Sequence, residues 1–219
     1  MTAEATLRMD RMYRYQRHIY DLSRKFYLLG RDRAIRELEP GRGARICEIG
    51  CGTGRNLVAL ARRYPDAAIF GIDASNEMLK TAHATIARAG LAGRIRIERC
   101  LAEDLDPGAT FGLDTPFDAI LFSYTLSMIP DWSRAVERAV EVLKPAGLLA
   151  VVDFSEQRGL PDWFRTMLRR WLTLFDVSPR AELPDYLGAL ARRERASLTI
   201  APLYGDYACL LRYRRPAAL

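Results

Sequence analysis

Three glycines at alternate positions follow a glutamate in residues 48–54, which read Glu-Ile-Gly-Cys-Gly-Thr-Gly. An apolar run ends at Ile49 and a helical pattern begins at Asn56, so these residues predict a strand, a tight turn and a helix start. Glycines let the backbone turn sharply and let a ligand approach where a Cβ atom would clash. The free N–H groups of the helix start would face that ligand. The pattern therefore favours a nucleotide-like cofactor.

An acidic residue, Asp73, ends the next apolar run. Its carboxylate could accept hydrogen bonds from both hydroxyls of a ribose, and it follows Gly54 by about the 20 residues expected of such an acid. Glu48 and Asp73 have plainer explanations as caps of the turn and of the helix that follows Ser75. Met78 could likewise be an ordinary core residue.

Alternating strands and helices must position these residues. Strands are predicted at 45–49, 68–73, 95–100, 117–123 and 148–154, and helices at 56–64, 76–89 and 132–143. Most of the strands are continuous apolar runs, as expected when helices cover both faces of a sheet. The pattern predicts an α/β fold with a doubly wound, mostly parallel sheet, whose ligands bind beyond the carboxyl ends of the strands.

The last third of the chain is less regular. A helix is predicted to start near Trp163, with a wide apolar face over residues 163–175 and three arginines off that face. Two strands, around 198–202 and 208–213, could complete the sheet as an antiparallel pair. We expect residues 1–43 to form a helical lid that binds substrate and residues 44–219 to form the cofactor-binding domain.

Composition narrows the class of protein. The chain has 219 residues and 24.8 kDa, and its longest uncharged apolar runs are shorter than the roughly 18 residues of a membrane span. With no apolar signal segment, we expect a cytoplasmic protein. The four cysteines lack CxxC spacing and the two histidines are far apart, so we expect no metal site.

The net charge of +6 is unevenly distributed. Residues 1–45 carry +5, residues 46–154 carry −3 and residues 155–219 carry +4. Basic flanks suit an anionic surface, either a membrane or a nucleic acid. The alternative is a solvated, arginine-rich surface.

The identity of Arg55 bears on which cofactor is bound. A dinucleotide fingerprint requires Gly or Ala at that position. The GxGxG pattern with an acid two residues before the first Gly instead resembles class I S-adenosylmethionine-dependent methyltransferases. Four further motifs agree in order and spacing: Asp73, the run 102–105 (Ala-Glu-Asp-Leu), the pair 117–118 (Phe-Asp) and the run 143–147 (Leu-Lys-Pro-Ala-Gly).

This resemblance implies a Rossmann-like sheet of seven strands and S-adenosylmethionine as cofactor. The residues it implies for cofactor binding are Arg24, Glu48, Gly50, Gly52, Gly54, Asp73, Ala74, Met78, Ala102, Glu103 and Ser123. Many relatives have an acid at the position of Leu101, which accepts from the adenine amino group. Glu103 could substitute for it, or the amino group could bond elsewhere.

A stripe of aromatic and basic residues marks the N-terminal segment. Tyr13, Arg17, Tyr20, Arg24 and Tyr27 follow one another at spacings of four, three, four and three, which places them on one helical face. Tyrosine faces attract cationic groups, and arginine holds carboxylates or phosphates. The stripe predicts a substrate with a cationic and an anionic end, unless these side chains simply face solvent.

Residues 12–32 resemble the start of the N-methyltransferases of bacterial betaine-lipid synthesis. The resemblance implies trimethylation of the amine of diacylglyceryl-homoserine, with phosphatidylethanolamine or a small-molecule amine as the alternative acceptor. We expect catalytic residues among Tyr20, Tyr27, Tyr124 and His18, and substrate-binding residues among Tyr13, Arg17, Tyr20 and Tyr204.

A lipid acceptor predicts contact with an anionic membrane surface, through the 163–175 face and the basic flanks. Burial of that face on the sheet or in a dimer is the competing expectation, and the oligomeric state stays open. No nucleic-acid partner is expected, because the Asx-Pro-Pro-aromatic motif that holds a flipped base is absent after residue 123. A cofactor-binding protein that regulates a partner is the non-enzymatic alternative.

Overall fold

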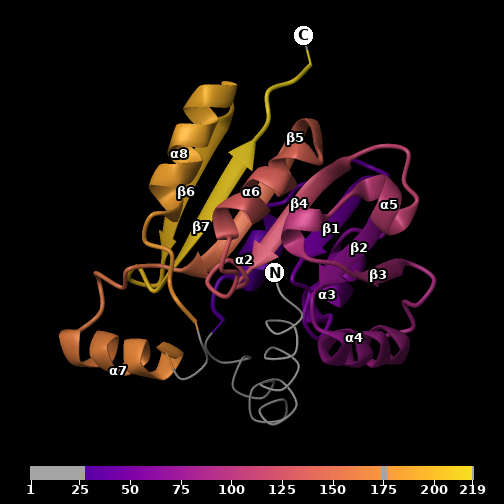
Figure 1. The fold of residues 1–219 in the computed structure, drawn as a ribbon. Helices are drawn as coiled ribbons and strands as arrows, with labels where there is room; N and C mark the ends of the chain where they lie inside the picture. The colour runs from indigo at the N-terminus through magenta and orange to yellow at the C-terminus, as the bar shows by residue number, and fades with distance from the viewer. Residues whose placement is uncertain (1–27, 174–176, 219) are drawn as a thin grey trace.

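A seven-stranded sheet organises the chain in a computed structural model that describes residues 28–173 and 177–218 (Figure 1). The strands are β1 (Arg45–Ile49), β2 (Ala68–Asp73), β3 (Ile95–Arg99), β4 (Phe117–Ser123), β5 (Leu143–Phe154), β6 (Ser197–Leu203) and β7 (Ala208–Arg214). Their order is β3-β2-β1-β4-β5-β7-β6. The first five strands are parallel, and β7 is antiparallel to both β5 and β6. The predicted mostly parallel sheet with a C-terminal antiparallel pair is therefore confirmed.

Helices cover both faces of this sheet. They are α2 (Arg31–Arg36), α3 (Arg55–Arg63), α4 (Asn76–Arg88), α5 (Pro107–Phe111), α6 (Trp132–Glu141), α7 (Asp162–Thr173) and α8 (Leu183–Glu194), with a short 3₁₀ helix η1 (Ala102–Asp104). Buried residues of α2, α3, α4 and α7 belong to one apolar cluster, and those of α5, α6 and α8 belong to the other. The two clusters lie on opposite faces of a doubly wound sheet.

Two local predictions differ from the structure. The fifth strand begins at Leu143 rather than at 148, because the run 143–147 forms an irregularity inside β5, where Ala146 has a φ of 59° and the register to β4 shifts. Helix α8 was not predicted, although Pro184 lies in its first turn, where proline is favoured; its buried leucines at positions 183, 187 and 190 pack on the sheet.

The described part of the apolar face predicted over residues 163–175 is partly buried and partly exposed. Leu168 and Leu172 of α7 are buried, whereas 69% of Trp163 and 53% of Met167 are exposed. In Figure 1, α7 lies near the turn that joins β6 to β7, at the opposite end of that strand pair from the C-terminus. No helix among the described residues combines the length and the hydropathy that crossing a membrane requires.

Candidate active site

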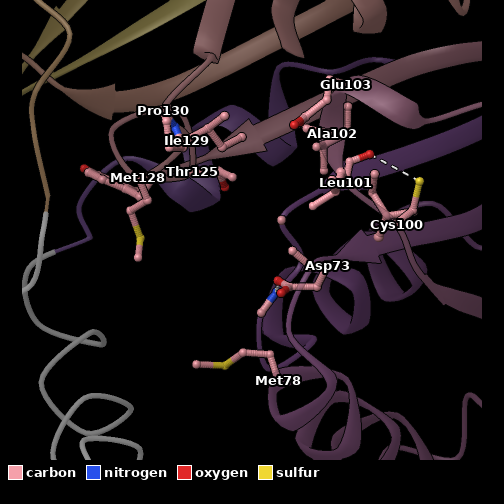
Figure 2. Close-up of a pocket in the computed structure, with 16 residues that line it drawn as sticks. Asp73, Met78, Cys100, Leu101, Ala102, Glu103, Thr125, Met128, Ile129 and Pro130 are labelled. Atoms are coloured by element: carbon pink, nitrogen blue, oxygen red, sulfur yellow. Dashed lines mark hydrogen bonds between the residues drawn. The ribbon is translucent and has the colours of Figure 1, made fainter. Parts of the chain in front are cut away.

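Two adjoining pockets lie beyond the carboxyl ends of β1, β2 and β4, and both are lined by Gly50 and Gly52. The apolar pocket is lined by Ile49, Gly50, Gly52, Ile72, Asp73, Ala74, Met78, Cys100, Leu101, Ala102, Glu103, Tyr124, Thr125, Met128, Ile129 and Pro130 (Figure 2). The polar pocket is lined by Leu28, Arg31, Glu48, Gly50, Cys51, Gly52, Thr53, Arg55, Asn56 and Ser123. The topology thus gathers nearly all the predicted cofactor residues of the described chain into one region.

The glycine-rich turn forms the boundary between these pockets. Gly50 has a φ of 71°, and a Cβ atom there would lie 2.2 Å from the methyl carbon of Thr125. Gly54 lines neither pocket; with a φ of 78° it precedes α3 and allows close packing against Ala82 of α4. The turn is fixed to β2, since the N–H groups of Gly50 and Cys51 donate to the carbonyl oxygen of Ile72 at 2.8 and 2.9 Å. Gly50 is therefore needed for backbone shape and for space together.

Asp73, at the end of β2, joins the turn to the start of α4. One carboxylate oxygen accepts from the N–H of Gly52 at 2.8 Å and the other accepts from the N–H of Ser75 at 2.9 Å. Asp73 thus accepts from a backbone N–H group next to α4, which is part of what the capping alternative expected. The cap of α4 itself is Ser75, whose side chain accepts from the N–H of Met78. Each carboxylate oxygen has further lone pairs, so the same group can accept hydroxyl donors from the pocket.

Glu48 and Ser123 place polar groups on the floor of the polar pocket. Glu48 is buried, and its Oε1 accepts from Nδ2 of Asn56 at 2.7 Å. Ser123, at the end of β4, is also buried, and its hydroxyl has no hydrogen-bond partner among the described residues. A buried hydroxyl without a partner is costly, so it fits a pocket that receives a polar ligand group.

The apolar pocket has the shape of a slot between two elements. Figure 2 shows Met128 on one side, in the loop after β4, and Asp73 and Met78 on the other. Leu101 and Ala102 close the end, and Glu103 adds one carboxylate at the rim. Apolar walls with a few polar groups suit a flat heteroaromatic ring.

Tyr124 is among the residues that line the apolar pocket, but its hydroxyl group is engaged elsewhere. The hydroxyl donates to the carbonyl oxygen of Leu29 at 2.5 Å, and the ring packs edge-on against Phe154 at 4.7 Å between centroids. Burial raises the pKa of Tyr124 well above its ordinary value. The predicted catalytic tyrosine therefore anchors the segment before α2 through its hydroxyl group.

Two further cavities lie near the polar pocket. The first shares lining residues with the polar pocket, and the second shares lining residues with the first. The arginine pocket is lined by Leu28, Leu29, Gly30, Arg31, Asp32, Arg33, Arg36, Arg55 and Tyr204. The apolar groove is lined by Leu29, Leu160, Phe164, Met167, Leu168, Trp171, Tyr204 and Tyr207. Predicted substrate residue Tyr204 is 57% exposed and lines both cavities. The predicted residues Tyr13, Arg17, His18, Tyr20, Arg24 and Tyr27 lie outside the described residues.

Several lining residues were not predicted from the sequence, among them Arg31, Asn56 and Thr125. Arg31 is buried and its Nε donates to the carbonyl oxygen of Leu28 at 3.0 Å. A sequence signal for it did exist, because Arg17, Arg24 and Arg31 are seven residues apart. Thr125 carries no such signal, since its role depends on how closely the loop after β4 approaches the glycine turn.

Residues 46–147 match the methyltransferase domain family. Over these residues the chain is similar to a methyltransferase domain, and its sheet has the mostly parallel strand order described above. Its cofactor is S-adenosylmethionine. The residues present fit this group, because Gly50 leaves the backbone open beside the pockets and Ser123 offers a buried, unpartnered hydroxyl among the described residues. The apolar pocket would hold the adenine, Asp73 the ribose and the polar pocket the amino-acid end.

The methyltransferase relatives of the chain act on different atoms. A ubiquinone/menaquinone biosynthesis C-methyltransferase of Geotalea daltonii is 30% identical over 145 residues, which cover 64% of this chain and 60% of that protein. An O-methyltransferase of Penicillium expansum is 30% identical over 149 residues, which cover 66% of this chain and 51% of that protein. The chain thus spans between half and three fifths of the length of these relatives.

A solved structure supports the fold over most of the chain. An O-methyltransferase family 2 protein from Planctomyces limnophilus superposes with a TM-score of 0.65 at 21% identity, over 90% of this chain and 61% of that chain. At this identity the likeness concerns the fold alone.

Proposed function

We propose that the protein transfers methyl groups from S-adenosylmethionine to the amine of a lipid headgroup, with diacylglyceryl-homoserine as the acceptor and the trimethylated betaine lipid as the product. One observation carries this proposal: shared lining residues link an apolar groove, through one intervening pocket, to the cofactor pockets. The groove shares Leu29 and Tyr204 with the arginine pocket, which in turn shares Leu28, Arg31 and Arg55 with the polar pocket.

The groove suits the apolar part of a lipid. It has a volume of about 510 Å³, and all eight of its lining residues are apolar or aromatic. Its walls come from α7 and from the turn between β6 and β7, so it opens beside the helix that exposes Trp163 and Met167. A small polar acceptor would leave this surface uncovered, whereas an acyl chain would bury it.

Methylation of an amine requires the protein to position the reacting atoms and needs little acid–base catalysis. When bound, S-adenosylmethionine supplies an electrophilic methyl group. The chain's residues must hold a neutral amine in line with that group, and the positive charges of Arg31 and Arg55 disfavour the protonated amine. The resemblance of residues 12–32 to betaine-lipid N-methyltransferases favours nitrogen as the acceptor atom. The C- and O-methyltransferase relatives make carbon and oxygen acceptors the competing outcomes.

The dependence of rate on acyl-chain length tests the proposed acceptor. We expect kcat/KM to rise steeply from glyceryl-homoserine to its dihexanoyl and dioctanoyl forms, because each CH₂ buried in the groove contributes about 0.8 kcal/mol. Phe164→Ala, in the groove, should flatten this dependence, while Ile200→Ala, at an exposed position on β6, should leave it unchanged. Equal kcat/KM values for all three acceptors would contradict a lipid-binding groove.

A lipid acceptor also requires access to a bilayer, and we propose that α7 provides it on an anionic membrane surface. The exposed Trp163 and Met167 lie four residues apart, and the helix also carries Arg165, Arg169 and Arg170 against one acid, Asp162. Aromatic and apolar side chains flanked by arginines are typical of helices that lie in the membrane interface.

Flotation with anionic vesicles tests this contact. The full chain should float with phosphatidylglycerol vesicles at low salt, and a Trp163→Ala/Met167→Ala variant should remain in the soluble fraction. The matched control is Ile200→Ala, which removes an exposed apolar side chain from another element. Equal flotation of the double variant and the control would assign membrane contact to a different surface.

A further inference from the structure

An unusual concentration of positive charge lies between the cofactor pockets and the apolar groove. The arginine pocket has a volume of about 260 Å³. Four of its nine lining residues are arginines, at positions 31, 33, 36 and 55, and Asp32 is the only acid among them. Its formal charge is therefore +3, at the place where an acceptor's headgroup would lie.

The acids near the pocket do not neutralise all these arginines. Arg33 pairs with Glu37 at 2.6 Å, and Arg55 pairs with Asp32 at 3.2 Å. Arg36 is exposed and forms no ion pair with any residue of the described ranges 28–173 and 177–218. Within the described part of the chain, the guanidinium group of Arg36 is thus available to an anionic ligand, next to others that reinforce its charge.

The position of the pocket defines what it would contact. Leu28, Arg31 and Arg55 also line the polar pocket, where the amino-acid end of the cofactor would lie. Leu29 and Tyr204 also line the apolar groove. An amphiphile with its apolar part in the groove and its amine at the cofactor would therefore place its headgroup at the arginine pocket.

We infer that the arginine pocket binds an anionic group of the acceptor, a carboxylate or a phosphate, and that Arg36 determines specificity for acceptors that carry one. Guanidinium groups bind both anions through paired, charge-assisted hydrogen bonds. This inference rests on the proposed function for the placement of the acceptor. It adds a requirement for negative charge that the amine and the groove alone do not impose.

Binding measured without turnover tests the inference. Isothermal titration calorimetry in the presence of S-adenosylhomocysteine would use dihexanoylglyceryl-homoserine, its carboxyl methyl ester and dihexanoyl-phosphatidylethanolamine. The variants are Arg36→Gln and the charge-conserving Arg36→Lys. The control is Arg42→Gln, whose side chain is 95% exposed and lines none of the four cavities.

We expect Arg36→Gln to weaken binding of the anionic acceptors about tenfold or more, as for loss of a charged hydrogen bond. Arg36→Lys should retain most of the affinity, and the methyl ester should bind weakly to every variant. Tighter binding of the carboxylate or of the phosphate lipid tells which anion the pocket prefers. Equal affinity for the ester, the acid and the phosphate lipid, or equal effects of Arg36→Gln and Arg42→Gln, would overturn the inference. Binding of an anionic lipid without methyl transfer would instead contradict the proposed function.

Discussion

At the scale of single residues, the contact between Gly50 and Thr125 controls how closely a ligand can approach the turn after β1. The left-handed φ of Gly50 and the 2.2 Å separation between its hypothetical Cβ and Thr125 are independent penalties for any side chain. The left-handed backbone conformation costs a residue with a side chain about 1–2 kcal/mol. The close approach to Thr125 is a steric clash, which a shift of the Thr125 side chain can relieve.

Gly50→Ala should therefore destabilise the fold and abolish cofactor binding, and the double variant Gly50→Ala/Thr125→Ala should recover part of the loss. Urea unfolding measures the free energy, and calorimetry with S-adenosylhomocysteine measures affinity. If removal of the threonine side chain gave no recovery, the steric part of the explanation would be wrong.

Asp73 is predicted to hold the ribose of the cofactor. Asp73→Ala should weaken binding of S-adenosylhomocysteine by tenfold or more, because hydrogen bonds to a charged acceptor contribute about 1.5–3 kcal/mol. Since Asp73 also accepts from the N–H groups of Gly52 and Ser75, Asp73→Asn serves as a second variant of nearly the same shape. Unchanged affinity in calorimetry would refute the assignment.

Asp153 is a buried acid that lies on β5 outside the pockets. Its oxygens accept from the N–H groups of Phe154 at 2.8 Å and Ser127 at 3.1 Å, yet burial raises its pKa to about 6. The folded protein therefore binds the proton more tightly than the unfolded chain. The resulting stabilisation is complete below about pH 4 and is lost as the pH rises through about 6.

The free energy of unfolding should thus fall by about 3 kcal/mol between pH 4 and pH 7, relative to an Asp153→Asn variant that cannot titrate. Subtracting the variant's profile removes the contributions of other groups. Urea titrations at several pH values measure both curves, and parallel curves would contradict the assignment.

A site residue could be predicted from the sequence only where the sequence also determines its position in the fold. Glu48, Asp73 and Ser123 lie at the carboxyl ends of strands and Ala102 lies shortly after one. Parallel strands bring these ends together, so the sequence was enough to place the four residues at one edge. The engaged hydroxyl of Tyr124 was not predictable, because it depends on a contact 95 residues away in sequence.

At the scale of elements, the hydrogen bond from Tyr124 to Leu29 ties the loop after β4 to the segment that enters α2. Both residues border cavities of the site: Tyr124 the apolar pocket, Leu29 the arginine pocket and the groove. This bond therefore links the cofactor region to the proposed acceptor region.

Tyr124→Phe should lower the free energy of unfolding by about 1 kcal/mol and loosen residues 28–36 more than the sheet. Hydrogen exchange followed by mass spectrometry would show faster deuterium uptake in peptides that cover α2. Uptake that rises equally in β1 and β4 would indicate a general loss of stability instead of a released anchor.

The main elements of the central domain followed from hydrophobic pattern alone. Runs 45–49, 68–73 and 117–123 matched β1, β2 and β4, because a strand buried on both faces is apolar throughout. Prediction failed for α8, whose buried leucines pack against the sheet, because tertiary packing contributes most of a helix's stability.

At the scale of the whole molecule, four neighbouring cavities lead from the apolar pocket to the apolar groove. Each shares lining residues with the next, and the series changes from apolar to polar, then to strongly basic and back to apolar. A cofactor with an apolar ring and a polar end matches the first two cavities. An amphiphile with an anionic headgroup matches the last two.

The most direct test of this account is to identify the atom that is methylated. The purified chain would be incubated with methyl-labelled S-adenosylmethionine and a panel containing diacylglyceryl-homoserine, phosphatidylethanolamine, small amines and phenolic and quinol acceptors, with tandem mass spectrometry of the products. We expect one, two and three labelled methyl groups on the nitrogen of diacylglyceryl-homoserine. Label found on carbon or oxygen, or on a small amine in preference to the lipid, would contradict it.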